Sequence, residues 1–277
     1  MSKFQLVAVV LAAVLFLFLY VAVPTKPKER KQIDKTRALQ AEEPATISID
    51  QLLRASKGKF ETEKLEPILQ LEKTLESGSD KEKTETLKSI SSEWNKLDQF
   101  AIGGFYAEEV AKAENSGTAW SIAGTTYYTC FQQSVDSLIR AHCIDKAIGN
   151  FESAISLEPN NQTHRVNLGL CYVNGSANPM KGILMIREIA EKYPDNALAL
   201  ITLGKLSLRT NQLEKALQRF EAVLKNDPEN VDAHFWLGQT FLQKGDKSKA
   251  ADYLKKCIQL TDDLDMQKRV TSILNSL

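Results

Sequence analysis

The sequence contains few of the residues that mark several common protein classes. Its 277 residues include only 4 Cys, 13 Gly and 8 Pro. Four cysteines are too few for a disulfide scaffold, and so little Gly and Pro excludes a loop-rich β-sandwich or a low-complexity chain. The 35 basic and 35 acidic residues cancel, which leaves no excess of positive charge to bind nucleic acid. Because 43% of the residues are hydrophobic, the chain also differs from a highly charged disordered one.

Motifs for catalysis and for metal binding are missing as well. The sequence has no G-x-S-x-G, P-loop or dinucleotide fingerprint, and none of its three His lies in an H-E-x-x-H pattern. The cysteines lack C-x-x-C spacing, which indicates neither a zinc site nor a redox pair. His142 and Cys143 are neighbours, but consecutive side chains on a helix point about 100° apart. We therefore predict no enzymatic activity, no metal site and no cofactor.

A long apolar run opens the chain. Residues 4–23 contain a single polar member, Gln5, and a helix of this length would be about 30 Å long, the thickness of the hydrocarbon core of a bilayer. The run is longer than the apolar part of most signal peptides, and Val stands before Pro24 where cleavage needs small residues. We interpret residues 1–23 as an uncleaved single transmembrane anchor, expected in a bacterial inner membrane, with a signal peptide as the alternative.

The segment after the run, residues 24–48, is polar and basic. It repeats no apolar face, which predicts a flexible linker. Positive charge beside an anchor slightly favours the cytoplasm for the rest of the chain, with the periplasm as the alternative. The same charges are able to contact anionic lipid headgroups. Within residues 26–37, only Glu29 and Asp34 oppose the basic residues, which are Lys26, Lys28, Arg30, Lys31, Lys35 and Arg37.

From residue 49 onward, apolar residues recur at intervals of three and four, as in amphipathic helices. No segment shows the sustained alternation of a β-strand, so we predict an all-α fold. Three markers then repeat at intervals of 34 or 35 residues, which predicts an array of structural repeats. The markers are a Leu-Gly pair (Leu168-Gly169, Leu203-Gly204, Leu237-Gly238), a proline (Pro159, Pro194, Pro228) and a small residue (Ala147, Gly182, Ala216, Ala250).

With these markers the chain resembles the tetratricopeptide repeat family, whose unit is a pair of antiparallel helices, A and B, of about 34 residues. The resemblance implies an α-solenoid with four units over 117–262 and a degenerate unit within the helical region 49–116. It also implies a helix over 263–277 that caps the last unit. In the first unit about 11 extra residues separate Tyr127 from Ala147, either in longer helices or in a loop.

Several helix boundaries follow from local signals. Gly78 is expected to separate the first two helices, and the proline of each unit to end helix B. Asn178 followed by Pro179 predicts an N-cap with Pro at the first helical position. Asn211 and Glu214 have the spacing of a capping box, which predicts a helix that starts after Asn211.

In the family, A helices line the face that holds a partner, and the resemblance carries this role to thirteen residues. They mix apolar and polar side chains with a basic pair, which suits a peptide or a helix with apolar anchors. Ser121 and Thr125 replace the Lys and Asn with which one subfamily clamps chaperone carboxylates, so we do not expect that ligand. The thirteen are Thr125, Tyr128, Thr129, Val166, Leu170, Asn174, Ile201, Lys205, Leu208, Arg209, Phe235, Gln239 and Gln243.

These features together predict a membrane-tethered scaffold that binds a peptide or helix of a partner protein, as an assembly or translocation factor. A tether raises the local concentration of the two parties, so a modest affinity suffices. The expected partners are a protein and the membrane, and not nucleic acid. The alternative is a structural subunit of a larger membrane-associated complex that binds no free peptide.

Overall fold

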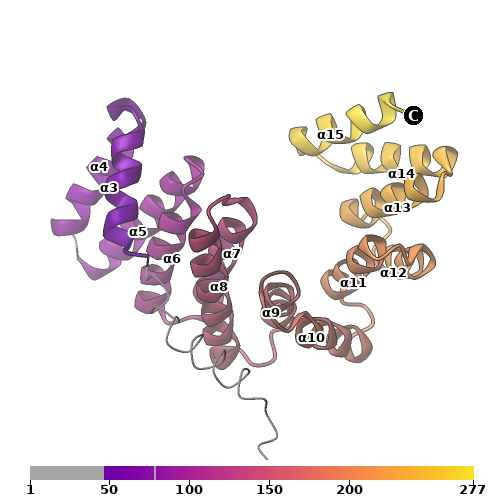
Figure 1. The fold of residues 1–277 in the computed structure, drawn as a ribbon, viewed down its shortest axis with the longest axis horizontal. Coiled ribbons are helices and arrows are strands. Elements are labelled where there is room, and N and C mark those ends of the chain that lie inside the picture. The colour runs from indigo at the N-terminus through magenta and orange to yellow at the C-terminus, as the bar shows by residue number, and fades with distance from the viewer. Residues whose placement is uncertain (1–46, 78) are drawn as a thin grey trace, which may run out of the picture. The chain divides into compact units, whose positions relative to one another are not determined.

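The computed structural model describes residues 47–77 and 79–277, and every regular element in these ranges is an α-helix (Figure 1). The predicted anchor, most of the predicted linker and Gly78 lie outside the described residues. Of the helices within them, none is long and apolar enough to cross a bilayer. The fold of residues 47–277 is therefore all-α, as the absence of strand patterns predicts.

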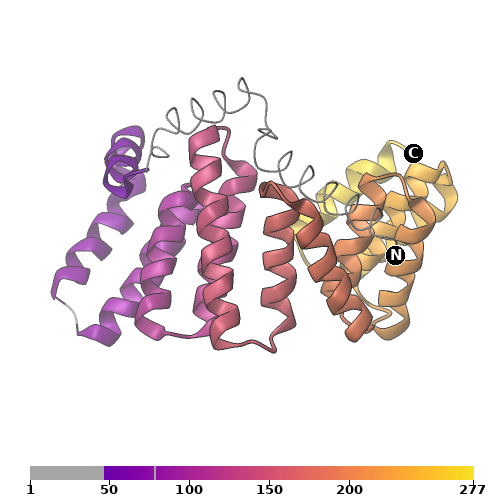
Figure 2. The same ribbon diagram turned by 60° about the horizontal axis from the view of Figure 1, so that its bottom comes forward.

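The helices are labelled α3 to α15 in chain order. They are α3 (Ile49–Lys59), α4 (Thr62–Ser77), α5 (Asp80–Lys96), α6 (Phe100–Glu114), α7 (Gly117–Gln133), α8 (Ser137–Leu157), α9 (Gln162–Gly175), α10 (Pro179–Lys192), α11 (Ala197–Arg209), α12 (Leu213–Asn226), α13 (Val231–Lys244), α14 (Lys247–Leu260) and α15 (Leu264–Asn275). Each packs chiefly on its neighbours in the chain, and Figure 2 shows the pairs stacked one after another. Helices α7, α9, α11 and α13 are the A helices of successive units.

The repeated glycines lie where an A helix crosses its B helix. A Cβ added to Gly124 would lie 3.0 Å from the ring of Phe151, and one added to Gly238 would lie 2.6 Å from Cγ of Leu254. The absence of a side chain lets the two backbones approach, while the large residue on helix B fills the space beside them. The Leu-Gly marker is thus a packing requirement, which explains why it repeats with the period of the fold.

Most of the predicted helix boundaries are confirmed. Asn178 accepts a hydrogen bond from the backbone nitrogen of Lys181 at 3.3 Å, and Pro179 opens α10. The marker prolines lie in the turns that follow α8, α10 and α12. The capping box at Asn211 is wrong: this residue has φ 57° just after α11, and α12 begins at Leu213 without a side-chain cap. Asn adopts the left-handed conformation more readily than most residues, so here it ends a helix.

The extra residues of the first unit lengthen both of its helices. Helix α7 has 17 residues and α8 has 21, whereas α9 to α14 have 13 or 14. A disulfide joins Cys130 of α7 to Cys143 of α8, which the cysteine spacing did not predict. Two cysteines pair when their helices face each other in register, and a separation of 13 residues does not reveal that register. Because Cys143 is bonded, it presents no thiolate beside His142.

Candidate partner-binding face

The A helices contact each other in the order α7, α9, α11, α13, which brings equivalent positions of successive units into one row. The first predicted position of each of the last three units is buried: Val166, Ile201 and Phe235 are 0%, 9% and 1% exposed. Val166 packs in the core with Ile186, and Phe235 packs with Val270 of α15. These three residues stabilise the stack and are not available to a partner.

The other ten predicted residues reach solvent. Thr125, Lys205, Arg209 and Gln243 are exposed, and Tyr128, Thr129, Leu170, Asn174, Leu208 and Gln239 are half-buried. Most of them lie one or two turns further along their A helix than the buried first position. We call these ten residues the A-helix face. In the last three units the family pattern therefore places its first position one turn too close to the start of the A helix for that residue to reach solvent.

A chain of hydrogen bonds crosses the A-helix face. The side-chain amide of Asn174 on α9 donates to the hydroxyl of Tyr128 on α7 at 2.6 Å. The guanidinium of Arg209 on α11 donates to the amide oxygen of Asn174 at 2.9 Å. Burial raises the pKa of Tyr128, which keeps its phenol protonated. Three successive units are thus linked through side chains whose positions are fixed before any partner arrives.

The same row continues from α11 to α13 through two contacts. The ammonium of Lys205 lies 4.8 Å from the ring centroid of Trp236, within the range of a cation–π interaction. The side-chain amide of Gln243 donates to Asn211 at 3.2 Å. Trp236 and Asn211 were not among the predicted site residues. Trp236 directly follows the buried Phe235 on a helix, so a rotation of the predicted face by one residue would have included it.

The charge on the A-helix face is positive. Its ten residues include two cations, Lys205 and Arg209, and no carboxylate. Among the described residues, no Asp or Glu oxygen lies within the 4.0 Å of an ion pair from either cation. The hydrogen bond to Asn174 and the contact with Trp236 orient the two cations without neutralising them. Both are therefore able to bind a carboxylate supplied from outside.

An apolar cavity of about 380 Å³ lies between α5, α6 and α7. Ala107, Val110 and Ile122 line it, and the ion pair of Lys88 with Glu114, 2.7 Å long, lies at its edge. Ile122 is 58% exposed although it is large and apolar. The repeat pattern gave no signal for this cavity because the unit that forms its other side is degenerate.

No group of three or more His, Cys, Asp or Glu side chains is placed to hold a metal ion within the ranges 47–77 and 79–277. His164 and His234 illustrate what the histidines do instead. A ring nitrogen of His164 lies 2.9 Å from Glu158, and one of His234 lies 2.9 Å from the carbonyl oxygen of Pro228. Each ring therefore ties the start of an A helix to the turn before it.

Residues 201–263, which include most of α11 and all of α12 to α14, match the family model of the tetratricopeptide repeat. The chain therefore contains tetratricopeptide repeats. It is 28% identical over 126 residues to "Tetratricopeptide repeat protein 1" of Schizosaccharomyces pombe, covering 45% of this chain and 12% of that protein. It is 30% identical over 146 residues to "Protein CTR9 homolog" of Arabidopsis thaliana, covering 50% of this chain and 13% of that one. The tetratricopeptide repeat protein described here thus spans about an eighth of the length of these relatives.

A solved structure shows the same fold. It is a thermophilic tetratricopeptide repeat protein of Thermus thermophilus, with a TM-score of 0.53 at 14% identity. The match covers 69% of this chain and 99% of the other. At this level of identity the likeness concerns the arrangement of helices. The function has to be argued from the surface residues of this tetratricopeptide repeat protein itself.

Proposed function

We propose that this tetratricopeptide repeat protein is a non-catalytic, membrane-tethered scaffold that binds a segment of a partner protein along the A-helix face. The observation that carries the proposal is the hydrogen-bonded row from Tyr128 through Asn174 to Arg209. A row that spans three units matches an elongated ligand better than a compact one. Because the side chains of the row are already fixed, binding costs less conformational entropy.

The chemistry of the face suits a polypeptide that carries both an apolar and an acidic side chain. Leu170 and Leu208 offer half-buried apolar contacts, and Lys205 and Arg209 lie beside them without a carboxylate partner. A hydrogen bond to a charged group contributes about 1.5–3 kcal/mol, so two such bonds together with apolar burial support a modest affinity. A tether that holds the two parties near one membrane makes such an affinity sufficient.

The test is a crosslinking pull-down of the full chain from intact membranes. The double substitution Lys205→Ala and Arg209→Ala removes both cations, and we expect the specific crosslinked partners to be lost. The matched control, Lys225→Ala with Lys256→Ala, removes two exposed lysines from the B helices α12 and α14. If the same partners are captured by both variants and by the wild type, the face does not bind them.

The tether itself rests on the sequence of residues 1–23. We propose a single-pass anchor in a bacterial inner membrane, with the basic segment behind it near the lipid headgroups. The protein should stay with the membrane pellet in alkaline carbonate and leave it only in detergent. Deletion of residues 1–23 should release the repeat domain into the soluble fraction. Release of the intact chain by carbonate alone would show that these residues do not form an anchor.

One observation favours the second candidate, a structural subunit of a larger complex. Met180 and Leu184 lie one turn apart on α10, where they are 55% and 53% exposed. Neighbouring exposed apolar residues of this size are typical of a surface that another protein covers. Replacement of both by Glu should then dissociate a stable co-purifying assembly. If only the Lys205 and Arg209 variant loses its partners, the scaffold proposal is favoured.

A further inference from the structure

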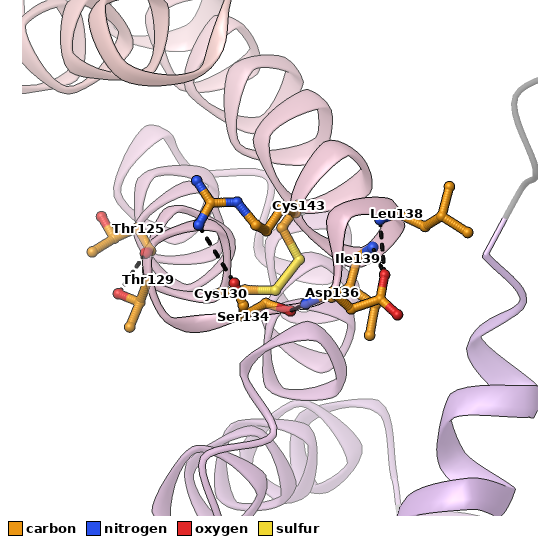
Figure 3. The surroundings of a disulfide bond; sticks show 9 residues. Thr125, Thr129, Cys130, Ser134, Asp136, Leu138, Ile139 and Cys143 are labelled. Carbon is orange, nitrogen blue, oxygen red and sulfur yellow. Dashed lines mark hydrogen bonds between the residues drawn. A yellow bond between two sulfur atoms is a disulfide. The ribbon is translucent and has the colours of Figure 1, made fainter.

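The disulfide between α7 and α8 is a feature that the repeat pattern does not explain. Cys130 lies in the last turn of α7 and Cys143 in the second turn of α8, with Cα atoms 5.9 Å apart. A Cα separation of this size is typical of disulfides. Figure 3 shows the bond between the two helices, with Leu138 pointing away from it.

The bond closes the base of the extra segment. In the next unit the equivalent positions are Gly175 and Asn178, three residues apart, whereas Cys130 and Cys143 are 13 apart. The tip of the segment between the cysteines is exposed: Val135 is 100% and Leu138 is 56% exposed. A covalent link restricts such a segment without further packing. The cysteines therefore link α7 to α8 at the base of the segment that breaks the repeat period.

The pair is built into the core. Cys130 and Cys143 are 3% and 0% exposed, and they pack with Tyr127 and Phe151. A third cysteine, Cys171, belongs to the same core cluster, but burial raises the pKa of its thiol to about 12. A thiol attacks a disulfide only as the thiolate, so Cys171 does not exchange with the bond. The disulfide is thus a structural one and not part of a redox relay.

The remaining cysteines are shielded from solvent. Cys171 and Cys257 are both unpaired and both buried. The part of the chain that the structure describes therefore presents one protected disulfide and no exposed thiol. This division of four cysteines suits an oxidising environment, where structural disulfides persist and exposed thiols would cross-link. In a reducing cytoplasm the pair would stay as two thiols and the extra segment would lose its link.

We infer that the repeat domain matures and works on the oxidising side of the membrane, opposite to the side that the basic flank slightly favours. The two thiols together give up two protons and two electrons and form the bond between their sulfur atoms, and a disulfide-bearing oxidant of that compartment takes up both electrons and both protons as its own S–S bond breaks to give a dithiol. The positive charge beside the proposed anchor is weak evidence against this placement, because large domains are translocated largely regardless of charge. The choice of membrane side rests on the proposed anchor, whereas the oxidised state of the pair does not. The partner of the A-helix face is then an exported protein.

The test counts free thiols of the full chain in intact cells. Cells are quenched with acid, the protein is denatured, and free thiols are labelled with a maleimide that adds a visible mass per cysteine. We expect two labels before reduction and four after it, because the chain has four cysteines and one disulfide. A Cys130→Ser control should take three labels without reduction. Since labelling is done on denatured protein, a folding defect in the variant does not affect the count.

A second measurement gives the side of the membrane. Protease added to cells with a permeable outer envelope and an intact inner membrane should digest the repeat domain. Four labels without reduction in the wild type would overturn the inference, and so would a domain that is protected until the inner membrane is opened. If the chain is found free of the membrane, the anchor proposal fails while the thiol count still decides the compartment.

Discussion

The first repeat unit and the third solve the same packing problem in different ways. In the third unit, α11 and α12 have 13 and 14 residues, and Phe220 fills the space over Gly204. In the first unit, α7 and α8 have 17 and 21 residues, and Phe151 fills the space over Gly124. The glycine crossing is the same in both, but the longer pair adds a disulfide where it extends past its neighbours. Packing at the helix crossing holds the regular unit together. In the first unit, whose helices are longer than the repeat period allows, a disulfide adds to that packing.

The two kinds of unit also differ in which of their side chains are held in place and which are exposed. The regular units carry the cations of the A-helix face. A hydrogen bond to Asn174 orients Arg209, and a cation–π contact with Trp236 orients Lys205. The first unit exposes apolar residues at the tip of the extra segment, where Leu138 is 56% and Val135 is 100% exposed. In a repeat array each unit stabilises only its neighbours, so a local change in one unit should leave distant units intact.

The largest effect is expected from the aromatic residue at the helix crossing. Phe220→Ala removes a fully buried ring from the regular unit and should lower the free energy of unfolding by about 3–5 kcal/mol. Phe151→Ala should cost a similar amount, but hydrogen exchange should stay slower around the cysteines of its unit while they are oxidised. Denaturant unfolding and hydrogen exchange measure the two effects. Equal exchange in both units would show that the disulfide adds no local protection.

Removal of the disulfide comes next. Cys130→Ala with Cys143→Ala should lower the free energy of unfolding by about 3 kcal/mol, as expected for a closed loop of this size. The loss should be concentrated in residues 131–142, because the regular units do not depend on the link. A reducing agent should destabilise the wild type by a similar amount and leave the double variant unchanged. A double variant as stable as the wild type would mean that packing alone holds the extra segment.

The sequence predicted the fold where the period holds and failed where the period breaks. Residues such as Gly204 and Pro228 have one structural role in each unit, so their recurrence reveals the architecture directly. The pairing of Cys130 with Cys143 depends on the register of two lengthened helices, and no repeated marker records that register. Asn211 was misassigned for a related reason: the same side chain that caps a helix start also tolerates the left-handed turn that ends one.

Only some of the residues that the structure joins across successive units were selected from the sequence. The family pattern selected Asn174 and Arg209, which the hydrogen-bonded row joins. It also selected Val166 and Phe235, which are buried, because periodicity gives the direction of a side chain but not what covers it. The capping helix α15 covers Phe235, with the guanidinium of Arg269 4.9 Å from the ring centroid. Such a contact joins residues far apart in the chain, so it is known only from the packed structure.

A smaller effect, dependent on pH, is expected at the ion pair that joins α6 to α8. Glu108 is buried and lies 3.0 Å from Lys146. Burial alone would raise the pKa of Glu108, but Lys146 and Lys112 outweigh it and hold the pKa below its usual 4.5. A lowered pKa in the folded state stabilises the protein fully above the unfolded value, and that contribution is lost as the pH falls through the folded value. Lys146→Met should cost about 1–3 kcal/mol at neutral pH, because it leaves a buried carboxylate without its main partner.

The matched control for this pair is in the regular region. Glu214 bonds Lys244 at 2.6 Å but is 75% exposed, so Glu214→Gln should change stability by less than about 0.5 kcal/mol. Glu108→Gln should flatten the dependence of stability on pH below about pH 5, whereas Glu214→Gln should leave it as in the wild type. Denaturant titrations across the acid range measure both. A pH dependence that persists in Glu108→Gln would assign it to other carboxylates.

The smallest effect on stability, and a large one on binding, is expected at Asn174. Asn174→Ala removes both hydrogen bonds of the row, and a half-exposed bond contributes about 0.5–1.5 kcal/mol at most. Tyr128 and Arg209 then move freely, and a partner has to order them on binding. Affinity for a partner segment should fall about tenfold, which corresponds to about 1.4 kcal/mol, while the melting temperature changes little. An exposed amide off the face, Asn226 at the end of α12, is the control for substitution by Ala. A binding loss in both variants, or in neither, would contradict a role of the row in binding, because Asn174 connects units through the A-helix face and Asn226 does not.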